Sequence, residues 1–197
     1  LPDPHAVLVH RISPLQVLKR GLSEADFGAS VLNHLSRPGT CNVAYNGRAY
    51  DHVMSQHLAW RCLRDPYGWH WRSQCSRWDI IDVLRAAYAL RPDGIEWPTN
   101  EGGYASFRLG DLAAANGIQL ESAHDAYEDV VAMLATARLL KRSQPALYEY
   151  GLSLRSKGKV RSVVRGPFVW VSSFFSGEHR CASLMACLLY TSDAADE

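Results

Sequence analysis

The sequence predicts a globular α/β domain, in which helices cover a sheet of short buried strands. Apolar residues recur at helical spacing within residues 15–35 and 126–141. Between these segments, residues 40–45 form a short strand-like run that ends at an Asn46-Gly47 turn. The 197 residues are 47% apolar and 21% charged, which is ordinary for a globular protein.

The remaining elements each have a local signal. Ser23 predicts an N-cap, because acidic residues follow it in the first turn. Residues 76–84 begin as a strand and pass into a helix that ends at residue 90. The other predicted helices are 15–35 in two pieces, 51–63, 108–116, 126–141 and 143–154. The apolar stripe predicted for the helix at 126–141 consists of Ala126, Val130, Met133, Leu134, Ala137 and Leu140.

Composition limits the classes of protein. Lys and Arg total 21 against 20 Asp and Glu, and this net charge of +1 leaves nucleic acid and small molecules both open as partners. Five cysteines without a CxxC pair disfavour a disulfide framework or a zinc site and favour a reducing cytoplasm. No run of about 18 apolar residues predicts a membrane span. Because the chain opens at Leu1 without Met, we expect a fragment or a processed chain.

Composition changes towards the C-terminal end. Residues 155–161 are basic and predict a flexible connector, whereas residues 168–171 alternate like an aromatic strand. We therefore expect one domain over residues 1–160 and the start of a second over 161–186. Residues 187–197 continue no pattern and resemble the translation of a sequencing adapter, so we expect an artefact and exclude them from the fold.

The candidate chemistry centres on residues 122–130. Asp125 can cap the following helix together with Glu128, which leaves His124 in the loop just outside. Asp129 borders the apolar stripe, where an unpaired carboxylate is costly, and Glu128 falls on the solvated face. Mg²⁺ would remove that cost, and a neighbouring histidine can take the proton from an attacking water. The alternative is that these acids only complement the helix dipole.

Asp51 is a second candidate carboxylate. It follows the predicted strand at 40–45 and a tight turn, so it lies at the mouth of a sheet. Ligands of open α/β sheets bind beyond the carboxyl ends of the strands, which favours a role in a site. The alternative, a simple N-cap of the helix at 51–63, is equally compatible with the sequence.

Aromatic residues and arginines interleave in the middle of the chain. This mixture suits a single nucleic-acid strand, because bases stack on rings while guanidinium groups pair with phosphates. Some rings can instead be ordinary core, which is the favoured interpretation for Trp78 and an even alternative for Trp71. The residues concerned are Tyr67, Trp69, Trp71, Arg72, Arg77, Arg85, Arg91, Phe107 and Arg108.

Two of these stretches resemble motifs of one nuclease superfamily. Residues 45–51, Tyr-Asn-Gly-Arg-Ala-Tyr-Asp, resemble the second exonuclease motif of the DEDDh superfamily. Residues 123–129, Ala-His-Asp-Ala-Tyr-Glu-Asp, resemble its third motif, the H-x4-D form. The segments 65–67, 76–79, 88–92 and 106–109 are similar to the bacterial exodeoxyribonuclease I family in particular, and the match covers about residues 2–186. The resemblance implies an RNase H-like domain followed by the start of an SH3-like β domain.

The resemblance also implies roles for individual residues. His124 would be the general base, Asp129 a direct ligand of Mg²⁺ (Mn²⁺ is the alternative ion), and Asp51 a supporting carboxylate of the metal site. Gln56 departs from the pattern, since a basic DNA-contacting residue is expected there. The residues expected to contact the DNA strand are Tyr67, Trp71, Arg85, Arg91, Phe107 and Arg108.

A larger departure concerns the family's first motif, a strand that carries Asp-x-Glu. No such strand precedes Asp51, because Glu24 and Asp26 fall on a predicted helix. We therefore expect an RNase H-like domain that lacks its N-terminal strands. We also expect this polypeptide to have little or no catalytic activity and to fold poorly, with helix faces left exposed.

The function implied by the resemblance is that of a monomeric, cytoplasmic bacterial 3′→5′ exonuclease, without a membrane partner. It would hydrolyse single-stranded DNA with Mg²⁺ in repair and recombination, with single-stranded DNA-binding protein as a partner. One alternative is a related DEDDh exonuclease that acts on RNA or in proofreading, which residues 76–79 and 91–95 argue against. The other is a non-catalytic single-strand-binding module, which the absence of an Asp-x-Glu strand upstream of Leu1 in the intact gene would establish.

Overall fold

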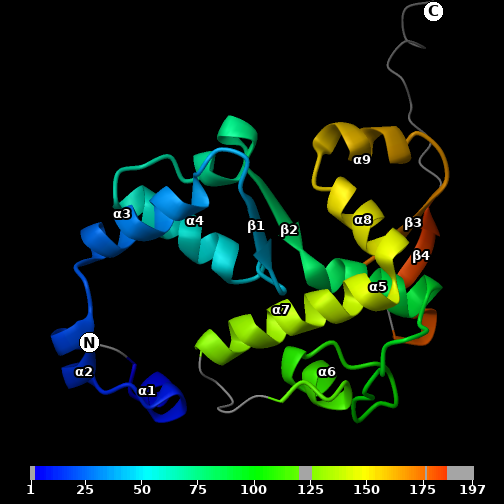
Figure 1. The fold of residues 1–197 in the computed structure, drawn as a ribbon, viewed down its shortest axis with the longest axis horizontal. Coiled ribbons are helices and arrows are strands. Elements are labelled where there is room, and N and C mark those ends of the chain that lie inside the picture. The colour runs from blue at the N-terminus through cyan, green and yellow to red at the C-terminus, as the bar shows by residue number, and fades with distance from the viewer. Residues whose placement is uncertain (1–2, 120–125, 176, 186–197) are drawn as a thin grey trace, which may run out of the picture.

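The computed structural model describes residues 3–119, 126–175 and 177–185, and Figure 1 shows helices arranged around two small sheets. The first sheet pairs β1 (Cys41–Ala44) with β2 (Ser76–Asp79), and the second pairs β3 (Phe168–Val171) with β4 (Ala182–Met185). The α-helices are α1 (Pro4–His10), α2 (Pro14–Arg20), α3 (Glu24–Leu35), α4 (Asp51–Arg61), α5 (Ile80–Leu90), α6 (Leu109–Ala115), α7 (Ala126–Ser143), α8 (Pro145–Ser153) and α9 (Lys157–Val163). Short 3₁₀ turns are η1 (Gly68–His70), η2 (Arg72–Gln74) and η3 (Gly177–His179).

Strands β1 and β2 are parallel, with Cys41 opposite Ser76 and Ala44 opposite Asp79. Both strands therefore end at the same edge of the sheet. The segment that leads into α4 leaves from this edge, and so does the start of α5, as Figure 1 shows. The predicted strands at 40–45 and 76 onward are confirmed, and the parallel pairing brings their carboxyl ends together as the α/β class requires.

The core lies between α5 and the helices α6, α7 and α8. Ile80 and Leu84 of α5 are fully buried there, together with Leu112 and Leu140. Trp78 on β2 is buried as well, and its Nε1 donates a hydrogen bond of 3.1 Å to the Gly151 carbonyl of α8. The favoured interpretation of Trp78 as a core residue is confirmed.

The predicted apolar stripe of α7 is partly wrong. Val130 and Leu134 are exposed, whereas Ala132 and Thr136 are buried. The helix packs against α6 and α8, and its buried face carries Leu139 and Leu140 as well. Tertiary contact, not apolarity alone, therefore decides which face is covered.

The N-terminal helices are separately capped. The Ser13 hydroxyl accepts from the Gln16 amide at the start of α2, and Ser23 accepts from the Asp26 amide at the start of α3. The predicted break within 15–35 and the Ser23 cap are both confirmed. Apolar side chains on these helices are exposed, Leu8, Leu18 and Phe27 among them. Poor folding of the polypeptide stays a prediction.

The flexible connector predicted at residues 155–161 is wrong, because α9 occupies most of it. Lysine and arginine have good helix propensity, and their charges here lie on an exposed helix. The predicted strand at 168–171 is confirmed as β3. The Arg180 guanidinium lies 5.3 Å from the ring of Tyr88, which links the β3–β4 unit to α5. Residues 187–197 fall outside the described residues.

Membrane crossing finds no support in the described ranges. None of their helices is both long enough and apolar enough to span a bilayer.

Candidate active site

The segment between β1 and α4 places Asp51 at the carboxyl edge of the sheet. Asn46 adopts a left-handed conformation with φ of 57°, and its amide donates a 2.8 Å hydrogen bond to Oδ1 of Asp79. Gly47 follows because the chain turns too tightly for a side chain: a Cβ there would meet the Cβ of Ala44 and lie 3.3 Å from Oδ2 of Asp51. The turn is therefore fixed from both sides before α4 begins.

Asp51 is not the N-cap of α4. The capping position belongs to Tyr50, which makes no side-chain cap hydrogen bond, and Asp51 is the first helical residue. Its side chain is exposed beside Gly47. Of the two interpretations left open by the sequence, the simple N-cap is not what the structure shows.

His52 is a buried neighbour that the sequence did not single out. Its ring lies 5.7 Å from the ring of Trp69, and neither ring nitrogen has a hydrogen-bond partner among the described residues. Burial lowers the pKa of His52, and the positive charge of Arg77 adds to the effect. This favours the neutral form of the imidazole, whose Nε2 lies beside Gly47.

The second predicted carboxylate, Asp129, stands in the first turn of α7. Asp129 is exposed and Glu128 is half-buried, the reverse of what the apolar stripe predicted. The reason is that α7 becomes buried only from Ala132 onward. Asp129 therefore carries no desolvation cost that a cation must remove. His124 and the Asp125 cap lie outside the described residues.

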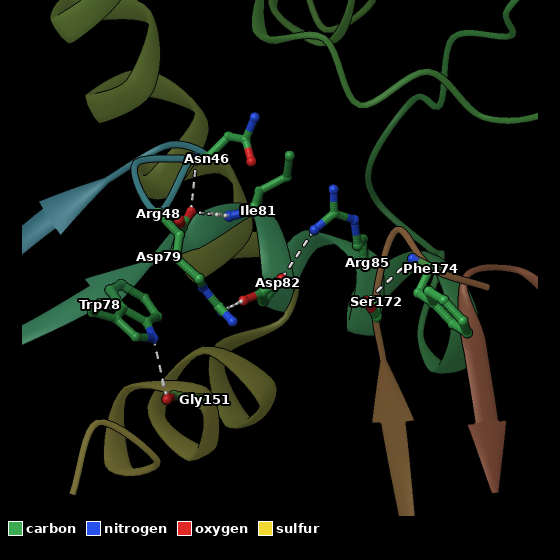
Figure 2. A network of polar contacts seen from close by, with 10 residues as sticks. All are labelled: Asn46, Arg48, Trp78, Asp79, Ile81, Asp82, Arg85, Gly151, Ser172 and Phe174. Atoms are coloured by element: carbon green, nitrogen blue, oxygen red, sulfur yellow. Dashed lines mark hydrogen bonds and ion pairs between the residues drawn. The ribbon is translucent and has the colours of Figure 1, made fainter. Parts of the chain in front are cut away.

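A carboxylate at the start of α5 joins two arginines across the sheet edge. Oδ2 of Asp82 accepts from Arg48 at 2.8 Å, and its Oδ1 accepts from Arg85 at 3.0 Å. Figure 2 shows Arg48 reaching Asp82 from the turn after β1, and Arg85 reaching it from the next turn of α5. The structure thus connects the two strand ends through one carboxylate.

Arg85 and Phe107, both predicted to contact DNA, are neighbours. The Arg85 guanidinium lies 5.8 Å from the Phe107 ring centroid, and its Nε is buried without a partner among the described residues. The Tyr45 hydroxyl donates a 2.8 Å hydrogen bond to the Phe107 carbonyl. Burial raises the pKa of Tyr45, so this phenol stays protonated and keeps donating. The contact fixes the 107 segment to the end of β1.

The aromatic loop after α4 presents two rings to solvent. Tyr67 and Trp71 are exposed, and Trp71 is stacked by Arg72 at 5.3 Å. Trp69 is buried instead, and its Nε1 donates to the Pro66 carbonyl at 2.9 Å. Trp71 is therefore open to stack on a base, whereas the buried ring of Trp69 holds the loop in place.

Arg91 and Arg108 lie at helix ends. Arg91 is the C-cap of α5, and its side chain donates to the Leu90 carbonyl at 3.2 Å. Arg108 precedes α6 and is exposed, as is Arg91. Gln56, where the sequence departs from its family pattern, is half-buried on α4. The two arginines are free to reach a phosphate, but no described contact joins them to the Asp82 cluster.

The two candidate carboxylates are chemically suited to bind a hard divalent cation. Asp51 and Asp129 are exposed, and carboxylate oxygens are the ligands that Mg²⁺ prefers. Within residues 3–119, 126–175 and 177–185, no three His, Cys, Asp or Glu side chains come close enough to hold a metal ion. The described residues thus offer Asp51 and Asp129 as candidate ligands, and His124 falls outside them.

The sequence missed Arg48, Asp79 and Asp82 as parts of the site. Arg48 stands inside the motif at 45–51, so its place near the sheet edge was available from the sequence. Its bond to Asp82, a residue 34 positions later, was not. Only the parallel register of β1 and β2 brings the two segments together.

Comparison with known proteins decides the family. The sequence model of the exonuclease family matches residues 1–137 of this chain. The chain belongs to the exonuclease family. It is 41% identical over 194 residues to exodeoxyribonuclease I of Escherichia coli (strain K12), covering 96% of this chain and 41% of that protein. It is 43% identical over 164 residues to exodeoxyribonuclease I of Haemophilus influenzae, covering 83% of this chain and 35% of that protein.

The fold gives the same result. The crystal structure of E. coli exonuclease I in complex with a dA16 oligonucleotide matches with a TM-score of 0.89 at 41% identity, over 94% of this chain and 41% of that one. The predicted similarity to exodeoxyribonuclease I and the RNase H-like exonuclease fold are confirmed. The chain spans about two fifths of the length of these relatives.

Proposed function

We propose that this chain supplies the strand-binding residues and part of the metal site of a Mg²⁺-dependent 3′→5′ exonuclease acting on single-stranded DNA. The observation that carries the proposal is the sheet edge, where Asp51 follows β1 and the Asp82 carboxylate holds Arg48 and Arg85. Metal-dependent phosphodiester hydrolysis uses carboxylates that hold the cation, and guanidinium groups can bind the phosphate of the substrate.

The residues would divide the work as follows. Asp51 and Asp129 would hold the cation, and His124 would take the proton from the attacking water. A bound divalent cation stabilises charge on the attacking and leaving oxygens. Trp71 and Tyr67 are exposed and would stack on bases, which is worth roughly 1–3 kcal/mol for each base.

The relatives support substrate and partner. One solved structure of E. coli exonuclease I holds a dA16 oligonucleotide, and another is a zinc-bound complex with single-stranded DNA. A further one is described as SSB/exonuclease I with an inhibitor. We accordingly propose single-stranded DNA as substrate, single-stranded DNA-binding protein as partner, and a cytoplasmic role in repair and recombination.

We also propose that the 197-residue chain by itself releases nucleotides slowly or not at all, because two carboxylates are few for a metal-dependent phosphodiesterase. Residues 1–160 would carry the exonuclease domain, and 161–186 would begin an SH3-like domain. The experiment must therefore read binding of metal and strand directly, besides hydrolysis.

The test uses the whole chain with a fluorescent dT16 oligonucleotide and, separately, with Mn²⁺ followed by electron paramagnetic resonance. We expect binding to dT16 over a duplex of equal length, and a Mn²⁺ site that Mg²⁺ displaces. Asp51→Asn should weaken Mn²⁺ binding by about tenfold or more. Strand binding without any Mn²⁺ site would favour a non-catalytic binding module, and preference for an RNA 16-mer would favour an RNA-directed enzyme. Absence of strand binding would overturn the proposal.

A further inference from the structure

The exposed arginine of the sheet edge is Arg48, not Arg85. The Arg48 side chain is 73% exposed, whereas that of Arg85 is 11% exposed and lies between Asp82 and the Phe107 ring. Both guanidinium groups bond to the same carboxylate, as Figure 2 shows. Arg85 is therefore placed to fix Asp82, and Asp82 to fix Arg48.

The guanidinium of Arg48 keeps unused donors. A guanidinium has five N–H groups, and the bond to Asp82 uses one nitrogen, Nη2. The carboxylate of the nearby Asp79 is directed instead to the backbone amides of Asn46 and Ile81. Arg48 can thus bind a phosphate through two N–H groups without leaving Asp82.

The position of Arg48 in the chain also supports a role at this site. Arg48 lies three residues before Asp51, in the turn at the carboxyl edge of the sheet. A long side chain held by a partner loses less rotamer freedom on binding than a free one. We propose that Arg48 binds a phosphate of the DNA strand beside Asp51, and that Asp82, itself fixed by Arg85, is the positioning residue for Arg48. The inference rests on the proposed function and names one contact of that site.

The test measures the affinity of the whole chain for fluorescent dT16 over a range of salt concentrations. Arg48→Ala should weaken binding roughly tenfold. It should also reduce the slope of log affinity against log salt by about 0.7, the value for one phosphate contact on a single strand. Arg61→Ala is the matched control, since Arg61 is also exposed and paired to a carboxylate, Glu24, at 2.6 Å. Its salt slope should stay close to that of the parent chain.

Asp82→Asn separates positioning from plain electrostatics. Removing a negative charge near DNA strengthens binding if charge alone matters, whereas loss of the Arg48 anchor weakens it. We expect weaker binding by Asp82→Asn, and unchanged or slightly stronger binding by the control Asp93→Asn, an exposed carboxylate just after α5. Arg48→Lys keeps the charge, so it should retain the salt slope and recover part of the affinity.

The outcomes are distinct. Parental affinity and slope in Arg48→Ala, or tighter binding by Asp82→Asn, would overturn the inference and leave the proposed function standing. Failure of the parent chain to bind dT16 would overturn both. A circular-dichroism melt of each variant shows whether lost binding comes from lost structure. If Arg48→Ala unfolds, the binding of Arg48→Lys is the test instead, because this variant keeps the charge at an exposed position. A retained salt slope with only part of the parental affinity then supports the inference, and full parental affinity overturns it.

Discussion

Asp79 joins the turn after β1 to the start of α5, and its removal should loosen both segments. Its Oδ1 accepts the Asn46 amide at 2.8 Å and the Ile81 amide at 3.3 Å. The first bond holds the turn after β1, and the second caps the N-terminus of α5. Figure 2 shows both bonds meeting at this one carboxylate.

The magnitude follows from these two bonds. Loss of an aspartate N-cap costs about 1 kcal/mol of unfolding free energy. A hydrogen bond from a backbone amide to a charged acceptor contributes about 1.5 kcal/mol or more. Asp79→Ala should therefore destabilise the chain by about 2–3 kcal/mol. Asp79→Asn keeps an acceptor oxygen and should cost about 1 kcal/mol.

Urea unfolding followed by circular dichroism measures these differences, with Asp93→Ala as the control because the Asp93 carboxylate is exposed and caps no helix. We expect the control to change the unfolding free energy by less than about 0.5 kcal/mol. Asp79→Ala should also weaken dT16 binding, since Arg48 and Asp51 depend on the turn. A loss below about 0.5 kcal/mol in Asp79→Ala would refute the idea that this carboxylate holds the edge together.

Three further predictions concern the loop and the core. Trp71→Ala should lower dT16 affinity by about 1–3 kcal/mol with unchanged unfolding free energy, because the residue is 56% exposed; equal affinity in a binding titration would contradict stacking. Trp78→Phe loses the bond to the Gly151 carbonyl and should cost about 2–3 kcal/mol in urea unfolding; a cost near zero would refute it. Burial, with Arg77 adding to it, lowers the pKa of His70 below its usual 6.5, so stability should be complete above that pH and fall below it. His70→Asn should flatten this fall below about pH 6.5, and an unchanged pH dependence would count against the shift.

The elements that could be predicted are those with a local signal. The Ser23 cap acts within a few residues, so the sequence displays it directly. The 40–45 strand is bounded by turn residues, and β1 occupies most of it. Helix α9 could not be read in this way, because a basic, glycine-containing stretch is also typical of a linker.

The same distinction between local and long-range signals applies to the residues of the site. Asp51 could be placed at the sheet edge because a turn and a helix start follow the strand. The exposure of Asp129 could not, since it depends on where α7 first meets its neighbours. The Arg48–Asp82 pair depends on strand register, which no local pattern encodes. Long-range pairing is thus the part of the site that only the fold reveals.

The central claim is that the segments around Asp51 and Asp129 meet at one metal ion. Fe²⁺ in place of Mg²⁺, with ascorbate and peroxide, produces radicals that cut the polypeptide next to the bound metal, and mass spectrometry locates the cuts. We predict cuts both within residues 46–52 and beside residue 129, suppressed by excess Mg²⁺ and lost together in Asp51→Asn. Cuts in only one of the two segments, or cuts that survive in Asp51→Asn, would contradict a shared metal site.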